Sequence, residues 1–107
     1  MRYPYGEDVA NCKTVSATST TQAVALPGVP QGLAPNDLLI VQLFNDGAGS
    51  AYYRFGPSTV EAAAPSGGNA GSAILPVGQF VQVQVLAKHT HIAVVAATTA
   101  TVHVVVA

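Results

Sequence analysis

The sequence predicts an all-β protein, a single antiparallel β-sandwich or jelly-roll-like domain with an extended N-terminal arm. Val, Thr, Gly and Pro are abundant, and these residues either restrict χ1 or interrupt helices. Short apolar runs recur along the chain with turn residues between them, the pattern of a sandwich or a jelly roll. The 107 residues suffice for one domain. We place the arm at 1–13 and the sandwich at 14–107.

The clearest strand signal is the segment 79–85, in which glutamines and valines alternate almost perfectly. This period of two places one side of the strand on a core and the other in polar surroundings. The run 37–44 is mostly apolar instead, as expected of a strand that is covered on both faces. The nine expected strands are 13–19, 21–26, 37–45, 50–56, 58–64, 72–75, 79–87, 91–97 and 99–106.

The connections between these strands are rich in glycine and proline. Asp46-Gly47 predicts a tight hairpin with positive φ between the strands on either side of it. The segment 75–78 places Pro and Gly at the spacing of a turn, and 65–71 reads as a surface loop. The segment 27–35 holds three prolines and cannot continue a sheet ladder.

The balance of charge excludes several classes of partner. The formal net charge is −1, which argues against a nucleic-acid groove or a polybasic membrane patch. Charged residues make up only 8 % of the chain, against about 25 % in an ordinary soluble domain. Half of the chain is hydrophobic but only 7 % is aromatic. So little charge leaves a lone monomer poorly soluble, which predicts a subunit that hides surface in an assembly.

The sequence carries no recognisable targeting or membrane signal. Met1 to Asp8 has no apolar core of a signal peptide, and polar residues interrupt the apolar stretch 91–107 before it reaches the ~20 residues of a spanning helix. The single cysteine, Cys12, excludes an intramolecular disulfide and a site with several thiolates. We therefore expect synthesis in a reducing cytosol.

Both ends of the chain are candidate contact regions. The segment 102–106 is uncharged, β-prone and free of proline, so it must pair inside a sheet or across a subunit boundary, which makes Val104 and Val106 candidate interface residues. The first dozen residues carry Tyr3 and Tyr5 without strand periodicity. We expect an arm that docks on a neighbour, with a frayed terminus as the alternative.

No catalytic group stands out. Cys12 lies beside Lys13 without a nearby histidine, and the acidic residues are adjacent at the terminus or near turns and strand ends. No glycine-rich loop precedes a helix. We therefore expect neither an enzyme nor a bound cofactor.

His89-Thr90-His91 is the one arrangement with metal-ligand character. If both histidines lay on one strand they would share a face and could bind one metal, completed by a symmetry axis. They fall at a strand junction, however, and no acidic residue lies nearby to orient them. His89 and His91 are thus weak metal candidates, and a solvated turn is the preferred interpretation. We expect His103, among valines, to be partly buried and hydrogen-bonded.

The segment 51–56 collects aromatic residues and an arginine on one strand. Alternation directs Tyr53 and Phe55 to one side and Tyr52 and Arg54 to the other. The first pair can anchor a core. Tyr52 and Arg54 are candidate interface residues, since Tyr and Arg are enriched at binding hot spots, although an ordinary amphipathic strand explains them too.

Three segments resemble the small decoration, or cement, proteins of tailed-bacteriophage capsids. Residues 45–47 followed by 51–56 resemble that group's "N-x-G … A-y-v-R-f-G" stretch. Residues 74–78 resemble its "l-P-a-G" turn, and 90–96 resemble "t-h-i-A-a-i-a". The chain departs from the group at 104–107, where a glycine-containing tail is expected.

The resemblance implies a β-sandwich on the capsid exterior that is made in the host cytoplasm and stabilises junctions between capsomers. Its partners would be the major capsid protein and further copies of itself, with a trimer preferred because such junctions are often threefold, and neither nucleic acid nor membrane. Many weak contacts would then act together. The alternatives are another phage component (tail, head-to-tail connector or fibre base) and a carbohydrate-binding β-sandwich. For the latter, Tyr52 and Tyr53 on opposite faces, without any Trp, make a poor platform.

Overall fold

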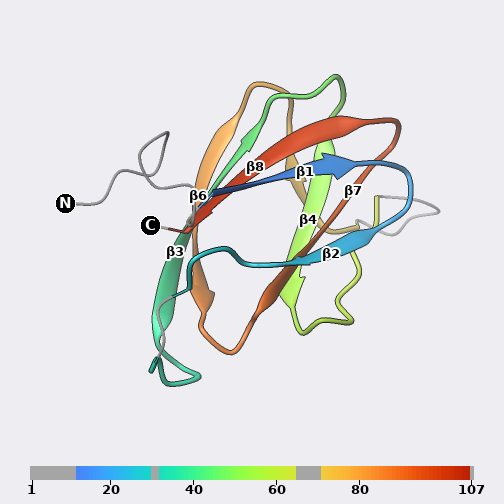
Figure 1. Ribbon diagram of the computed structural model, residues 1–107. Helices are drawn as coiled ribbons and strands as arrows, with labels where there is room; N and C mark the ends of the chain where they lie inside the picture. Colours follow the sequence, from blue (N-terminus) through green and yellow to red (C-terminus); the bar gives the residue numbers. More distant parts are fainter. Residues whose placement is uncertain (1–11, 30–31, 65–70, 107) are drawn as a thin grey trace.

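The computed structural model describes residues 12–29, 32–64 and 71–106, which form two four-stranded antiparallel sheets packed face to face (Figure 1). Sheet A has the order β1-β8-β3-β6, and sheet B has the order β2-β7-β4-β5. The strands are β1 (Cys12–Ala17), β2 (Gln22–Ala25), β3 (Leu38–Asn45), β4 (Ala51–Gly56), β5 (Ala73–Leu75), β6 (Phe80–Leu86), β7 (His91–Ala96) and β8 (Ala100–Val106). The predicted all-β sandwich is confirmed.

The strand pairing is that of one long hairpin rolled up on itself. The first strand pairs with the last, the second with the seventh, the third with the sixth and the fourth with the fifth, all antiparallel. Rolling adds two further contacts, β3 with β8 and β4 with β7. The result is a jelly roll, in which consecutive strands mostly cross from one sheet to the other.

The core between the sheets consists mainly of valine, leucine and isoleucine side chains from the inner faces. Its largest fully buried members include Leu43, Leu75 and Ile92. Val104 and Val106 belong to this core and are 0 % and 2 % exposed, because β8 lies between β1 and β3. The prediction that these two valines contact a partner is therefore wrong. The C-terminal strand satisfies its pairing inside the sheet, the first of the two possibilities open to it.

Strand β3 alternates between buried and exposed side chains although nearly all of them are apolar. Leu39, Val41 and Leu43 face the core, whereas Leu38 and Ile40 are 58 % and 38 % exposed on the outer face of sheet A. The interpretation of this run as a strand covered on both faces is thus wrong. A sheet of a two-layer fold has a second face that nothing in the layer arrangement covers.

The segment predicted as a strand at 58–64 is a loop. It starts with a turn in which Val60 N–H donates to the Pro57 carbonyl (2.9 Å), and further on Ala62 N–H donates to the Thr21 hydroxyl (2.9 Å). These backbone groups are satisfied by a turn and a side chain, so no ladder is needed. We call 57–64 the cover loop, because Val60 and Ala62 pack on the outer face of sheet B.

The connection 46–50 is not the tight hairpin that Asp46-Gly47 predicts. It carries the chain from β3 in sheet A to β4 in sheet B, and Gly47 does not have positive φ. A Cβ at Gly47 would lie 2.1 Å from the backbone nitrogen of Thr101. The glycine is required because the loop passes directly against β8. The turn predicted at 75–78 is confirmed: Gln79 N–H donates to the Pro76 carbonyl (3.1 Å), and Gly78 has φ 75°.

The boundary predicted after residue 13 is wrong, because Cys12 and Lys13 belong to β1 and pair with β8. Tyr3 and Tyr5 lie outside the described residues. The described part of the sandwich begins at Cys12.

Candidate binding surface

The outer face of sheet A carries an apolar groove of about 480 Å³. Four strands contribute to this face, and the register places their outward side chains side by side, for example Phe44 next to both His103 and Phe80. The outward side chains that line the groove are Cys12, Thr14, Phe44, Phe80, His103 and Val105. Lys13 also lines the groove and is the one Lys, Arg, Asp or Glu among its lining residues, so the groove suits an apolar or aromatic group of a partner.

Exposed hydrophobic side chains continue this face beyond the groove. Phe80 is 49 % exposed on β6, and Leu38 and Ile40 extend the apolar surface along β3. Together with the groove they give the outer face of sheet A an apolar area at each end of β3, and the Gln42–Gln82 pair, in which Gln42 Nε2 donates to Gln82 Oε1 (3.3 Å), lies between them. Clustered exposed apolar surface of this kind marks interaction sites, whereas single exposed residues do not.

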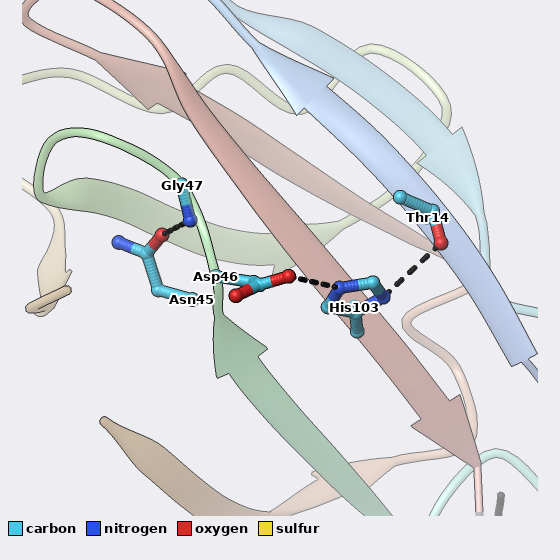
Figure 2. Close-up of polar contacts among 5 residues, drawn as sticks. All are labelled: Thr14, Asn45, Asp46, Gly47 and His103. Carbon is cyan, nitrogen blue, oxygen red and sulfur yellow. Dashed lines mark hydrogen bonds and ion pairs between the residues drawn. The ribbon is translucent and has the colours of Figure 1, made fainter. Parts of the chain in front are cut away.

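His103 stands at the end of the groove and joins three elements (Figure 2). Its Nδ1 lies 3.2 Å from the Thr14 hydroxyl on β1, and its Nε2 lies 3.6 Å from a carboxylate oxygen of Asp46. The imidazole also stacks on Phe44, with ring centroids 6.1 Å apart. His103 is half-buried and hydrogen-bonded, as the sequence predicts. The side chain ties β1, β3 and β8 together, so it supports the groove wall.

Asn45 anchors the loop beside this histidine (Figure 2). The side chain is completely buried; its Oδ1 accepts from Gly47 N–H (2.9 Å), and its Nδ2 donates to the carbonyls of Gly49 (2.9 Å) and Leu75 (2.8 Å). All of its polar atoms are therefore paired. This network holds Asp46 at the edge of the groove and links the two sheets at that end.

The outer face of sheet B is built differently, because the cover loop lies on it. Val60 and Ala62 pack against Ala93 and Val95, and Tyr52 lies half-buried beside this cluster. A Cβ on Gly56 would come within 2.9 Å of the Val60 side chain, so the loop approaches β4 closely. Tyr52 is thus largely engaged within the chain. Its neighbour on β5, Ile74, remains 54 % exposed.

Alternation along β4 is confirmed. Tyr53 and Phe55 pack on the core and contact each other edge to face, with centroids 5.9 Å apart, while Arg54 is exposed on the other side. Burial raises the pKa of the Tyr53 hydroxyl above its ordinary value of 10.0. Because Tyr52 and Tyr53 lie on opposite faces of sheet B, they do not form one aromatic platform for a sugar.

His89 and His91 do not share a strand. His89 lies in the turn after β6, where its N–H donates to the Leu86 carbonyl (2.9 Å), whereas His91 begins β7. The Nδ1 of His91 is 2.7 Å from the Thr90 hydroxyl. Within 12–29, 32–64 and 71–106, no three His, Cys, Asp or Glu side chains come together in a way that could hold a metal ion.

A shallower depression beside the cover loop brings Arg54 and His89 together. Glu61 and Thr59 of the cover loop line it as well. The sequence singled out Arg54 and His89 for different reasons, and the fold places them at one site, at the end of β4 away from the groove.

Phe44 and Phe80 of the groove, and Leu38 and Ile40 beyond it, were not among the predicted interface residues. For Leu38, Ile40 and Phe44 the sequence does carry a signal, because the β3 segment is apolar at most outward as well as inward positions. In a two-layer fold such a strand has one apolar face that its own layers leave open. The sequence alone does not say which of the two apolar faces will be covered.

The described residues contain no helix long and apolar enough to cross a membrane. Comparison with protein-family models, with curated proteins and with solved structures finds no match.

Proposed function

We propose that the protein is a structural component of a phage particle, a decoration protein that binds the outside of the head and stabilises capsomer junctions. The observation that carries this proposal is the apolar outer face of sheet A, with its groove and the exposed side chains of Leu38, Ile40 and Phe80. We assign to this face the contact with the major capsid protein.

The physical argument concerns the solubility and the energetics of this face. Transfer of apolar surface from water contributes about 25 cal/mol per Å², so covering it on a shell is favourable. Only 8 % of the chain is charged, which leaves little to oppose association. A shell presents many identical sites, and linked copies bind it more tightly than one contact would allow. Jelly rolls serve viral shells and sugar-binding proteins alike, so the argument rests on the surface and not on the fold.

The proposal includes self-association, with a trimer as the expected form at a threefold junction. It also includes a contact of Tyr3 and Tyr5 with the capsid or an adjacent copy. Both tyrosines lie outside the described residues. A chain that starts at Cys12 keeps all of β1. If the arm makes the proposed contact, this truncated chain will bind heads more weakly than the full chain, and unchanged binding would remove the arm from the proposal.

The deciding experiment is co-sedimentation of the labelled chain with heads and, separately, with tails of the phage that encodes it. We expect saturable binding to heads at a copy number approaching that of the major capsid protein. The variant Ile40→Asp places a charge on the outer face of sheet A and should reduce bound copies about tenfold or more, as for an interface hot spot. Ile74→Asp is the matched control, since Ile74 is exposed on the outer face of sheet B.

Two results would contradict the proposal in different ways. Binding confined to tails, or a few copies at one vertex, would assign the protein to the tail, the connector or a fibre base. Equal binding of Ile40→Asp and Ile74→Asp to heads would show that the outer face of sheet A is not the contact.

A further inference from the structure

Each sheet of the jelly roll has two edge strands, and they differ in how well they are protected against pairing with another chain. In sheet B, β2 and β5 are only four and three residues long. In sheet A, β1 carries Lys13, which lies opposite Val104 on the core-facing side of the strand and is nevertheless exposed. Short edges and inward-pointing lysines are established protections against edge pairing.

The fourth edge, β6, has no such protection within the part of the chain that the structure describes. It runs for seven residues, Phe80–Leu86, without a charge or a proline, and it pairs with β3 on one side only. A long, uncharged edge strand is a template for another strand. Among the described strands, β6 is therefore the edge most open to pairing with a strand of another chain.

The backbone groups of β6 that point away from β3 can be identified from the ends of the ladder. Ala87 N–H donates to the Asp37 carbonyl (2.7 Å), and Asn45 N–H donates to the Gln79 carbonyl (3.2 Å). In an antiparallel ladder, pairs that exchange hydrogen bonds alternate with pairs that do not. The odd-numbered residues of β6 thus bond to β3, and the N–H and C=O groups of Gln82 and Gln84 point outward.

We infer that two copies of the chain associate through β6, antiparallel across a twofold axis at Val83, and so join their A sheets into one eight-stranded sheet. The contact is isologous, since the same strand serves on both sides. Gln82 lies opposite Gln84 of the second copy in this register, which makes their outward backbone groups a hydrogen-bonded pair. Phe80 lies opposite Leu86, and Val83 opposite itself.

The side chains of β6 complement one another in this register. On the outer face, exposed Phe80 meets half-buried Leu86, and the amides of Gln82 and Gln84 meet each other. On the inner face, Val81 and Val83 are only partly buried at the rim of the core, and the second copy covers them. Apolar and amide pairs directly opposite each other stabilise strand pairing, and no like charges oppose it.

This inference does not depend on the proposed function. It concerns the free protein in solution and needs no capsid. A twofold contact through β6 also leaves the groove face of each copy on the same continuous sheet, so a dimer presents two such faces together. It predicts a dimer as the smallest assembly, where the threefold argument from capsid junctions predicts a trimer.

The first test is the molar mass of the purified full-length chain, by light scattering and sedimentation equilibrium from about 1 µM to about 100 µM, a range that covers weak self-association. We expect a reversible monomer–dimer equilibrium. Gln82→Pro removes an outward N–H and no backbone hydrogen bond to β3, and edge strands accept proline at such positions. It also removes the side-chain bond that Gln82 Oε1 accepts from Gln42 Nε2, and Gln82→Ala removes the same bond. Gln82→Pro should weaken dimerisation at least about tenfold, while Gln82→Ala, which keeps the N–H, should leave the dimer intact.

A second pair of variants tests the register without relying on proline. In Gln82→Lys/Gln84→Lys, each lysine faces a lysine of the second copy, and we expect a monomer. In Gln82→Lys/Gln84→Glu, each lysine faces a glutamate, and we expect the dimer to persist. Far-UV circular dichroism checks that all variants keep the β-sheet fold.

A wild-type chain that remains monomeric up to the highest concentration would overturn the inference, as would a trimer. A dimer that responds equally to the two double variants would overturn the register at Val83. A dimer that survives Gln82→Pro would exclude β6 as the contact.

Discussion

The outer faces of the two sheets have similar apolar sequence patterns, but one face is covered by a loop and the other is exposed. On sheet B, the cover loop places Val60 and Ala62 over Ala93 and Val95, so that an apolar face becomes a small second core. On sheet A, the described residues form no second cluster, and Leu38, Ile40 and Phe80 remain exposed. Apolar outward positions thus occur both on a face that is covered within the chain and on a face that stays exposed.

Three hydrogen bonds and the small size of Gly56 keep the cover loop in place. The Thr21 hydroxyl accepts a hydrogen bond from Ala62 N–H, and the Ser72 hydroxyl accepts one from Ala63 N–H (3.0 Å). The Ala63 carbonyl in turn accepts one from Ser72 N–H (2.8 Å). Gly56 leaves room for Val60. The loop therefore satisfies its backbone while it buries apolar side chains, and only sheet B has this arrangement among the described residues.

The largest expected effect comes from placing the same charge on the two outer faces. Ala93→Asp buries a carboxylate beneath the cover loop, where Ala93 is 0 % exposed, and should destabilise the fold by about 3–5 kcal/mol. Ile40→Asp, on the open face, should cost at most about 1 kcal/mol. Denaturant unfolding monitored by circular dichroism measures both. Equal losses would mean that the two faces do not differ as described.

A smaller effect is expected at the hydrogen bond that fastens the cover loop. Thr21→Val keeps the shape of the side chain but removes the acceptor for Ala62 N–H, which should cost about 1 kcal/mol. Limited proteolysis should then cut more readily within 57–64. Thr21→Ser retains the hydroxyl and serves as the control. Indistinguishable proteolysis of the two variants would show that packing of Val60 alone holds the loop.

The smallest expected effect is on the pH dependence of stability, through Tyr53 on the inner face of sheet B. The pKa of Tyr53 is raised by burial, so its folded-state stabilisation is complete below the unfolded pKa near 10 and is lost as pH rises through the raised folded value. Tyr53→Phe lacks this titration. It should lose less stability than the wild type as the pH rises above about 10 in denaturant unfolding. A parallel loss in both proteins would contradict this account.

The local pattern of the chain predicted the fold class and most strands correctly, because alternation and turn residues act over a few neighbours. Gln79 to Val85 alternates as an edge strand should, and Pro76 to Gly78 forms the expected turn. The segment 58–64 shows where this reasoning fails. Thr59 and Val60 have strand propensity, but the Thr21 hydroxyl and a local turn satisfy backbone groups of the segment, so it forms no ladder.

The predictions for single residues were less successful, because the environment of each residue depends on neighbours that are distant in the sequence. Val104 and Val106 looked like an exposed edge, and the rolled hairpin placed β8 between β1 and β3 instead. Gly47 suggested a hairpin turn and is in fact required where its loop passes against Thr101. In each case the deciding neighbour lies more than fifty residues away in the sequence.

By itself, the sequence determined that this protein is built of short antiparallel strands, that its core is aliphatic and that few of its residues are charged. These properties follow from composition and from a period of two, which are local. Only the tertiary structure decided which apolar face became a second core, which stayed open and which edge was left unprotected. That choice depends on which strands become neighbours, and in a jelly roll most neighbours are distant along the chain.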